Sequence, residues 1–199
     1  MTTNVKALTI LYRTELARLA PKVSGDMALH QRSIEWLAKI VEARRPSIVL
    51  ELGAGLSTVI LADACAEVGA SLYTYDHDAK WLASVRQLLK KLAAERHLRR
   101  GDHYWLDRTG LVAAAESNAW QPDLTLVDHG PSNTERLADL PMIVKASAPG
   151  ALILLDDCRR TTAYEREASK VLAKLGLQLT RSVESTAHDN RWLGVVQMP

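Results

Sequence analysis

Hydrophobic residues follow two alternating patterns along the chain: short apolar runs, and longer stretches in which apolar positions recur at helical spacing. The short runs predict strands, and the helical spacing predicts helices. The predicted strands cover 47–52, 71–75, 102–106, 124–127, 151–155, 177–183 and 191–198. The predicted helices cover 4–19, 34–41, 57–68, 79–98, 134–146 and 162–176. Strand and helix therefore alternate through most of the chain.

Polar and small residues mark several ends of these elements. Asp78 stands where the N-cap of the helix over 79–98 is expected, and Gly101 stands where that helix is expected to end. Thr162 and Glu165 have the spacing of a capping box at the start of the last helix. These signals agree with the order of elements that the apolar pattern predicts.

The alternation predicts an α/β fold. Strands separated by helices form a parallel sheet that is covered on both faces. The last two strands leave no room for a helix between them, so they predict an antiparallel hairpin at the end of the sheet. We expect a Rossmann-like doubly wound sheet of about seven strands, with the last strand antiparallel and extra N-terminal helices. The whole chain, 1–199, forms one domain, with a helical cover over 1–45 and the core over 46–199.

Composition narrows the class of protein. The chain has 199 residues, a net charge of +2 and an ordinary hydrophobic fraction of 47%, so nothing indicates a nucleic-acid partner. Charged residues interrupt the N-terminal segment, which argues against a signal peptide, and no apolar run reaches membrane-spanning length. The two cysteines form no disulfide framework, which favours the cytoplasm. The N-terminal helix offers a surface for a homodimer.

Acidic residues stand at or just past the ends of the predicted strands. They are Glu51, Asp76, Asp107, Asp128 and the pair Asp156 and Asp157. Ligands of parallel sheets bind beyond the carboxyl ends of the strands. A charge at a buried strand end is unfavourable unless something pairs with it. This edge of the sheet is therefore the candidate site.

The stretch IVLELGAGLSTVILA, residues 48–62, joins a strand to a helix through a turn with two glycines, Gly53 and Gly55. A dinucleotide-binding turn would have a third glycine where Thr58 stands, and a P-loop would have a lysine that is absent. Glu51 stands just ahead of the turn and would repel a pyrophosphate. The turn therefore favours a ligand without phosphate.

Asp76 ends the next strand, 23 residues after Gly53. An acidic side chain at that position accepts hydrogen bonds from ribose hydroxyls. A ribose partner together with Glu51 indicates a nucleoside with a cationic tail. S-adenosylmethionine is such a molecule.

Four stretches resemble a known family. ELGAGLST and YTYDHDAKWL are similar to the first two motifs of class I S-adenosylmethionine-dependent methyltransferases, and LTLVDHG and PGALILLDD extend the similarity to small O-methyltransferases. The resemblance runs from Ser24 to the C-terminus. It implies a cofactor site formed by Glu51, Gly53, Gly55, Ser57, Asp76, His77, Asp107 and Asp128. In that site Glu51 and the two glycines hold the methionine end, and Asp76 binds the ribose. His77 flanks the adenine and Asp107 contacts its amine, unless both are ordinary loop residues.

The carboxylates of Asp128, Asp156 and Asp157 form a second candidate site. Three close carboxylates repel one another unless a cation lies among them, and oxygen ligands suit Mg²⁺. Such an ion would bind a substrate hydroxyl, lower its pKa and orient it. Catechol-type O-methyltransferases look similar at VDH, and macrocin-type enzymes look similar at LLDD. The alternative is that Asp156 and Asp157 cap the following helix.

The sequence departs from the catechol type at one position. That type has a lysine base three residues after the first aspartate, where this chain has Pro131. His129 is the nearest titratable substitute, and its pKa suits a general base. A loop histidine without a catalytic role is the alternative.

These features predict an S-adenosylmethionine-dependent methyltransferase that acts on a small molecule, most simply on a hydroxyl. Asp128 and His129 are the catalytic candidates, and Mg²⁺ is the candidate assisting ion. Two alternatives remain. A protein that binds the cofactor without transferring its methyl group is consistent with the missing lysine. A nicotinamide-dependent oxidoreductase is the other, and Thr58 and Glu51 argue against it.

Overall fold

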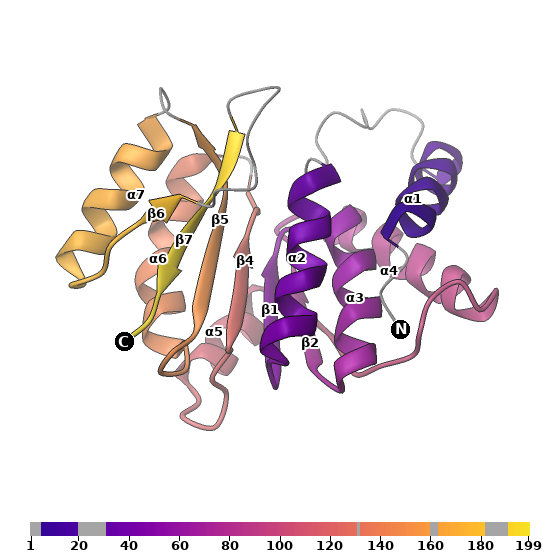
Figure 1. Cartoon of the computed structure of the whole chain (residues 1–199), viewed down its shortest axis with the longest axis horizontal. Coiled ribbons are helices and arrows are strands. Elements are labelled where there is room, and N and C mark those ends of the chain that lie inside the picture. Colours follow the sequence, from indigo (N-terminus) through magenta and orange to yellow (C-terminus); the bar gives the residue numbers. More distant parts are fainter. Residues whose placement is uncertain (1–4, 20–30, 131, 160–162, 182–190) are drawn as a thin grey trace.

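The strands of the chain form one sheet in the computed structural model, which describes residues 5–19, 31–130, 132–159, 163–181 and 191–199 (Figure 1). The strands within these residues are β1 (Ile48–Leu52), β2 (Ser71–Tyr75), β3 (His103–Leu106), β4 (Leu124–Val127), β5 (Leu152–Arg159), β6 (Thr180–Arg181) and β7 (Arg191–Gln197). Their order is β3-β2-β1-β4-β5-β7-β6. Strands β1 to β5 pair in parallel, whereas β7 runs antiparallel to β5 and β6. The predicted doubly wound sheet of seven strands is confirmed.

Helices cover both faces of the sheet. They are α1 (Val5–Leu19), α2 (Gln31–Arg44), α3 (Leu56–Val68), α4 (Ala79–Ala94), α5 (Arg108–Glu116), α6 (Asn133–Ala146) and α7 (Ala163–Lys174). Buried residues of α1 to α4 share one apolar cluster, and those of α5 to α7 share another. Val49 belongs to the first cluster, and Leu50 and Leu52 belong to the second, because successive side chains of a strand point to opposite faces. Glu51 therefore lies on the same face as Val49.

The predicted start of α4 is confirmed, but its predicted end is wrong. Asp78 caps the helix by accepting hydrogen bonds from the backbone N–H groups of Lys80 and Trp81. The helix ends at Ala94, before Gly101. Arg96 adopts the left-handed conformation, with φ of 60°, that a glycine would normally supply at a helix end. The sequence gives no warning of this, since arginine has no preference for that conformation.

Two further elements differ from the prediction. β5 continues past Leu155 to Arg159, with a register irregularity in which Asp157 has φ of 59°. Asp156 and Asp157 therefore lie within β5 and not in a loop after it. Helix α5 was not predicted, and it begins directly after Asp107. The capping box proposed at Thr162 lies outside the described residues.

No helix within the described residues has both the length and the apolar character needed to cross a membrane. The carboxyl ends of β1, β2 and β4 lie side by side, since Leu52 pairs with Tyr75 on one side and with Val127 on the other. The residues that follow these three strands therefore meet at one edge of the sheet.

Candidate functional site

The turn after β1 packs against the ends of both neighbouring strands. The N–H of Gly53 donates to the carbonyl oxygen of Tyr75 at 2.8 Å, and the N–H of Asp128 donates to the carbonyl oxygen of Leu52 at 2.7 Å. Gly53 has φ of 108°, and a Cβ at this position would lie 2.4 Å from the carbonyl oxygen of Asp128. Only glycine fits here, because any other residue would be strained and would collide with the chain after β4.

Gly55 has a different role in the same turn. Its backbone is extended, with φ of 176°, so no backbone strain requires a glycine. A Cβ would meet only the hydroxyl of Tyr12, at 3.7 Å. The N–H of Gly55 donates to Oγ1 of Thr58 at 2.7 Å, which fixes the turn to the start of α3. The missing side chain therefore leaves space beside the turn that none of the described residues fills, and a ligand can approach the backbone there.

Asp76 ties the end of β2 to the turn. Its side chain is buried and accepts hydrogen bonds from the N–H of Ala54 at 2.9 Å and from the N–H of Asp78 at 2.9 Å. Nδ1 of the half-exposed His77 lies 3.1 Å from Asp76 Oδ1. The indole Nε1 of Trp81 donates to the carbonyl oxygen of Ala54 at 2.7 Å. Both peptide groups of Ala54 are thus held by side chains from the segment after β2.

Glu51 lies fully buried beneath the turn. Its Oε2 accepts a hydrogen bond from Thr74 Oγ1 at 3.0 Å, since the two residues pair across β1 and β2. Burial raises the pKa of Glu51 to about 7, an increase that the hydroxyls of Ser57, Thr58 and Thr74 partly offset. Oε1 has no hydrogen-bond partner among the described residues. A buried oxygen without a partner is unfavourable, so it suits the cationic end of a ligand at the turn.

The carboxylates of Asp128, Asp156 and Asp157 lie together, with one oxygen of each within 4.8 Å of the others. Asp128 directly follows β4, whereas Asp156 and Asp157 lie within the neighbouring strand β5. Burial and the nearby charge of Asp156 raise the pKa of Asp128 well above its usual value, and Arg136 opposes that increase. The side chain of Asp157 is 36% exposed, so the set is open to solvent on its side.

Arg136 of α6 reaches into this acidic set and was missed by the sequence analysis. Its Nη2 lies 3.1 Å from Asp128 Oδ1, and its Nη1 lies 3.2 Å from Asp157 Oδ2. Its Nε donates to the carbonyl oxygen of His129 at 2.7 Å. A signal was present: Arg136 is a charged residue at helical spacing from the buried residues Leu140 and Ile143, where an apolar side chain is expected.

His129 is buried at the same edge. Its Nε2 lies 2.8 Å from Asp139 Oδ2, and its Nδ1 is buried without a hydrogen-bond partner among the described residues. Asp139 also pairs with Arg108 Nη2 at 2.7 Å. Burial alone would raise the pKa of Asp139, but the hydrogen bonds to His129 and Arg108 lower it to about 2. Neither ring nitrogen of His129 is presented to a substrate, so its predicted role as a base is not supported by this geometry.

Asp107 lies at the carboxyl end of β3 and caps α5. Its Oδ1 accepts a hydrogen bond from the N–H of Gly110 at 2.7 Å. This hydrogen bond gives Asp107 a structural role as the cap of α5. The proposed contact of Asp107 with an adenine amine stays a prediction.

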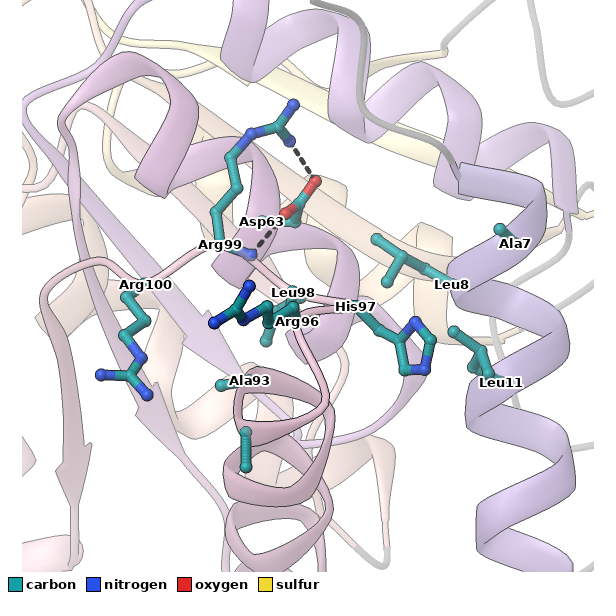
Figure 2. Close-up of a pocket in the computed structure, with 11 residues that line it drawn as sticks. Ala7, Leu8, Leu11, Asp63, Ala93, Arg96, His97, Leu98, Arg99 and Arg100 are labelled. Carbon is teal, nitrogen blue, oxygen red and sulfur yellow. Dashed lines mark hydrogen bonds and ion pairs between the residues drawn. The ribbon is translucent and has the colours of Figure 1, made fainter.

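A cavity of about 830 Å³ lies elsewhere in the fold, between α1, α3 and the C-terminal end of α4 (Figure 2). Its lining is formed by Ala7, Leu8, Leu11, Asp63, Ala93, Ala94, Arg96, His97, Leu98, Arg99 and Arg100. Asp63 pairs with Arg99 at its wall, and the backbone N–H of Arg99 also donates to Asp63 at 2.9 Å. None of the predicted site residues lines this cavity. The end of α4 leads to the amino end of β3, so the cavity is remote from the carboxyl edge of the sheet.

Comparisons with known proteins give one family and a set of similar folds. A family model described as a methyltransferase domain matches residues 50–158. A methyltransferase from Podospora anserina, PaMTH1, bound to S-adenosylhomocysteine, has a TM-score of 0.69 at 14% identity, covering 97% of this chain and 88% of its own. Cofactor-bound Rv0187 from MTB has a TM-score of 0.69 at 17% identity, covering 99% and 96%. The O-methyltransferase TomG from Streptomyces achromogenes, in complex with S-adenosylmethionine, has a TM-score of 0.67 at 16% identity, covering 98% and 90%. No curated protein matches the chain.

Proposed function

We propose a reaction for this chain from one premise: the chain belongs to the methyltransferase domain family, whose model matches more than half of it. The predicted resemblance and the predicted enzyme class are thereby confirmed. The proposed reaction is the transfer of a methyl group from S-adenosylmethionine to a hydroxyl of a small molecule. Structures of similar fold hold S-adenosylmethionine or its demethylated product. The family match favours this reaction over a nicotinamide-dependent oxidation.

The observation that carries the proposal is the junction between Asp76 and the turn at Gly53. Asp76 holds the backbone N–H of Ala54, and the turn itself offers backbone with no side chain in the way. Two acidic side chains lie next to this turn: Glu51 is buried beneath it, and Asp76 accepts from the N–H of Ala54. They disfavour a pyrophosphate and suit a ribose and a cationic amino acid tail. The residues present therefore fit S-adenosylmethionine.

S-adenosylmethionine supplies an electrophilic methyl group when bound. The chain contributes position and proton transfer, which account for most of the catalysis in such a displacement. Asp128 stands at the end of β4, next to the turn, where an acceptor hydroxyl would meet the cofactor. The raised pKa of Asp128 makes this carboxylate a better proton acceptor, so we assign the proton of the acceptor hydroxyl to Asp128.

His129 acts in this proposal as a positioning residue. Its side chain is 2% exposed and bound to Asp139, whereas its carbonyl oxygen accepts from Arg136. It therefore orients the segment after Asp128 from within the protein. Its predicted role as a base would require a change of this packing.

The sequence also predicts Mg²⁺ as an ion that assists the reaction. The carboxylates of Asp128, Asp156 and Asp157 are close enough to share a cation. Arg136 already lies against one oxygen of Asp128 and one of Asp157, so the set does not fit the ion without moving that side chain.

Helix α1 bears on two of the predictions, the single domain and the homodimer. Leu8 and Tyr12 of α1 belong to the same apolar cluster as Val49 of β1, which supports one domain with a helical cover over 1–45 and a core over 46–199. Ile10 is 66% exposed on α1, and the homodimer through this helix stays a proposal. The two cysteines of the chain are both free and buried, in keeping with the predicted cytoplasmic location.

Titration calorimetry tests the cofactor. S-adenosylmethionine and S-adenosylhomocysteine should bind to the purified chain with a stoichiometry of one, and NAD should give no heat. A panel of small hydroxyl compounds, assayed for S-adenosylhomocysteine formation, then tests the acceptor class. Binding of NAD in preference to S-adenosylmethionine would refute the proposal.

A further inference from the structure

We propose that Arg136 is the resident cation of the acidic set formed by Asp128, Asp156 and Asp157, and that it occupies the place of a divalent metal. The inference rests on the proposed function only for the location of the acceptor, which lies beside Asp128. The claim about cation binding concerns the free protein and can be tested without any turnover.

The guanidinium group bridges two strands through separate atoms. Nη2 lies 3.1 Å from Asp128 Oδ1 at the end of β4, and Nη1 lies 3.2 Å from Asp157 Oδ2 within β5. The fork of an arginine suits two carboxylates at once, which a lysine ammonium does not match. Arg136 therefore joins the end of β4 to β5 and pairs with two members of the set.

Other contacts hold the guanidinium in this position. Its Nε donates to the carbonyl oxygen of His129 at 2.7 Å, and its Cζ lies 5.9 Å from the ring centroid of Tyr164. The Arg136 side chain is only 10% exposed. All three guanidinium nitrogens thus have partners. Moving the side chain aside would leave a buried charge without its partners, which is strongly unfavourable.

Arg136 offsets part of the negative charge of the set. Three carboxylates and one guanidinium give a formal net charge of −2. A dication placed among these oxygens would also lie beside the guanidinium and repel it. Mg²⁺ needs near-octahedral oxygen ligands, and the atoms Asp128 Oδ1 and Asp157 Oδ2 face Arg136 instead.

Arg136 acts in this account as a positioning residue, because it reaches the acceptor only through Asp128. It fixes one oxygen of Asp128, the carboxylate to which the proposed function assigns the proton of the acceptor hydroxyl. Removal of its charge should do two things: it should loosen Asp128, and it should free a cluster of oxygens that binds metal. The second effect separates this role from a merely structural one.

Mn²⁺ binding to the free protein tests the proposal. Electron paramagnetic resonance measures the binding as a loss of the signal of free Mn²⁺. We expect no site in the wild-type protein that depends on Asp156. We expect Arg136→Met to gain Mn²⁺ affinity by at least tenfold, and Asp156→Asn in that background to remove the gain. Arg108→Met is the matched control, because Arg108 pairs with Asp139 outside the set, and it should gain no site.

Each result decides the proposal. A wild-type Mn²⁺ site that Asp156→Asn abolishes would overturn it, as would a folded Arg136→Met protein with unchanged Mn²⁺ affinity. Should Arg136→Met fail to fold, Arg136→Lys keeps one charge but loses the fork, and it should show a smaller gain in affinity; no gain would again overturn the proposal. If S-adenosylmethionine fails to bind while Arg136→Met gains the metal site, the proposed function fails and this inference stands.

Discussion

The carboxylate of Asp76 accepts a hydrogen bond from the backbone N–H of Ala54 at 2.9 Å, and so joins the end of β2 to the turn after β1. The same turn contacts the end of β4 through Gly53. A single loop thus touches the ends of three adjacent parallel strands. In folds of this type that place receives the nucleoside of the ligand.

Asp76→Ala should weaken the binding of S-adenosylmethionine by roughly 1–3 kcal/mol, because the ribose hydroxyls would lose a charged partner in a buried site. Titration calorimetry with S-adenosylhomocysteine measures the change. Glu116→Ala is the matched control, since Glu116 is an exposed acidic residue at the far end of α5. Equal affinities for the wild type and Asp76→Ala would remove Asp76 from the cofactor site.

The two glycines of the turn should respond differently to alanine. Gly53→Ala adds a Cβ at a position with positive φ and a 2.4 Å contact, so it should lower the free energy of unfolding by roughly 2–4 kcal/mol. Gly55→Ala meets no backbone strain and should leave stability near the wild-type value, but it should weaken cofactor binding by filling the open space. Urea unfolding and calorimetry of the pair separate the two roles. Equal stability of both variants would contradict this assignment.

Glu51 should make the protein less stable as the pH rises. Its pKa is raised to about 7 in the folded state, so the folded protein holds a proton that the unfolded chain releases near pH 4.5. The contribution of Glu51 to the free energy of unfolding is fully present below pH 4.5 and is lost as the pH rises through 7. The loss is at most about 3 kcal/mol. Urea unfolding at pH 5 and pH 8 measures this loss.

His103 titrates in the same range and must be separated from Glu51. It contacts Thr74 Oγ1, and burial lowers its pKa to about 4, so its effect has the opposite direction. The difference between the wild type and Glu51→Gln isolates the contribution of Glu51. The variant should lose less stability than the wild type between pH 5 and pH 8. Parallel pH profiles for the two proteins would show that Glu51 stays ionised.

Asp128 and His129 should differ in their effect on turnover. Asp128→Asn removes the proposed proton acceptor and should lower kcat by about 10²-fold. His129→Gln keeps a polar side chain in the buried position and should chiefly lower stability, with a smaller effect on kcat. The pH dependence of kcat in both variants is the measurement. If the acidic limb of the pH profile of kcat disappears in His129→Gln and not in Asp128→Asn, His129 is the base.

Local sequence patterns predicted the parts of the fold that depend on neighbours along the chain. The strand that contains Glu51, the N-cap at Asp78 and the turn at Gly53 each follow from a few adjacent residues, and the structure contains all three. The left-handed conformation of Arg96 could not be predicted. Gly101 was the expected residue at the helix end, and arginine does not favour a positive φ. The full length of β5 was also not predicted, because pairing with β7 extends the strand past the apolar run.

The candidate site was predicted less completely for a physical reason. The acidic residues at strand ends were visible because topology alone brings those ends together. The pairing of Arg136 with Asp128, and of Asp139 with His129, depends on how α6 packs across the sheet. A charged residue on the apolar face of α6 was the only sequence signal for these contacts, and its partners could not be read from spacing.

A crystal structure of the chain with S-adenosylhomocysteine tests the central claim most directly. The account predicts ribose hydroxyls within hydrogen-bond distance of Asp76, backbone of the turn at Gly53 and Gly55 against the amino acid tail, and the sulfur directed toward Asp128. S-adenosylhomocysteine bound instead in the cavity beside α1, or bound at the carboxyl edge with its ribose away from Asp76, would contradict it.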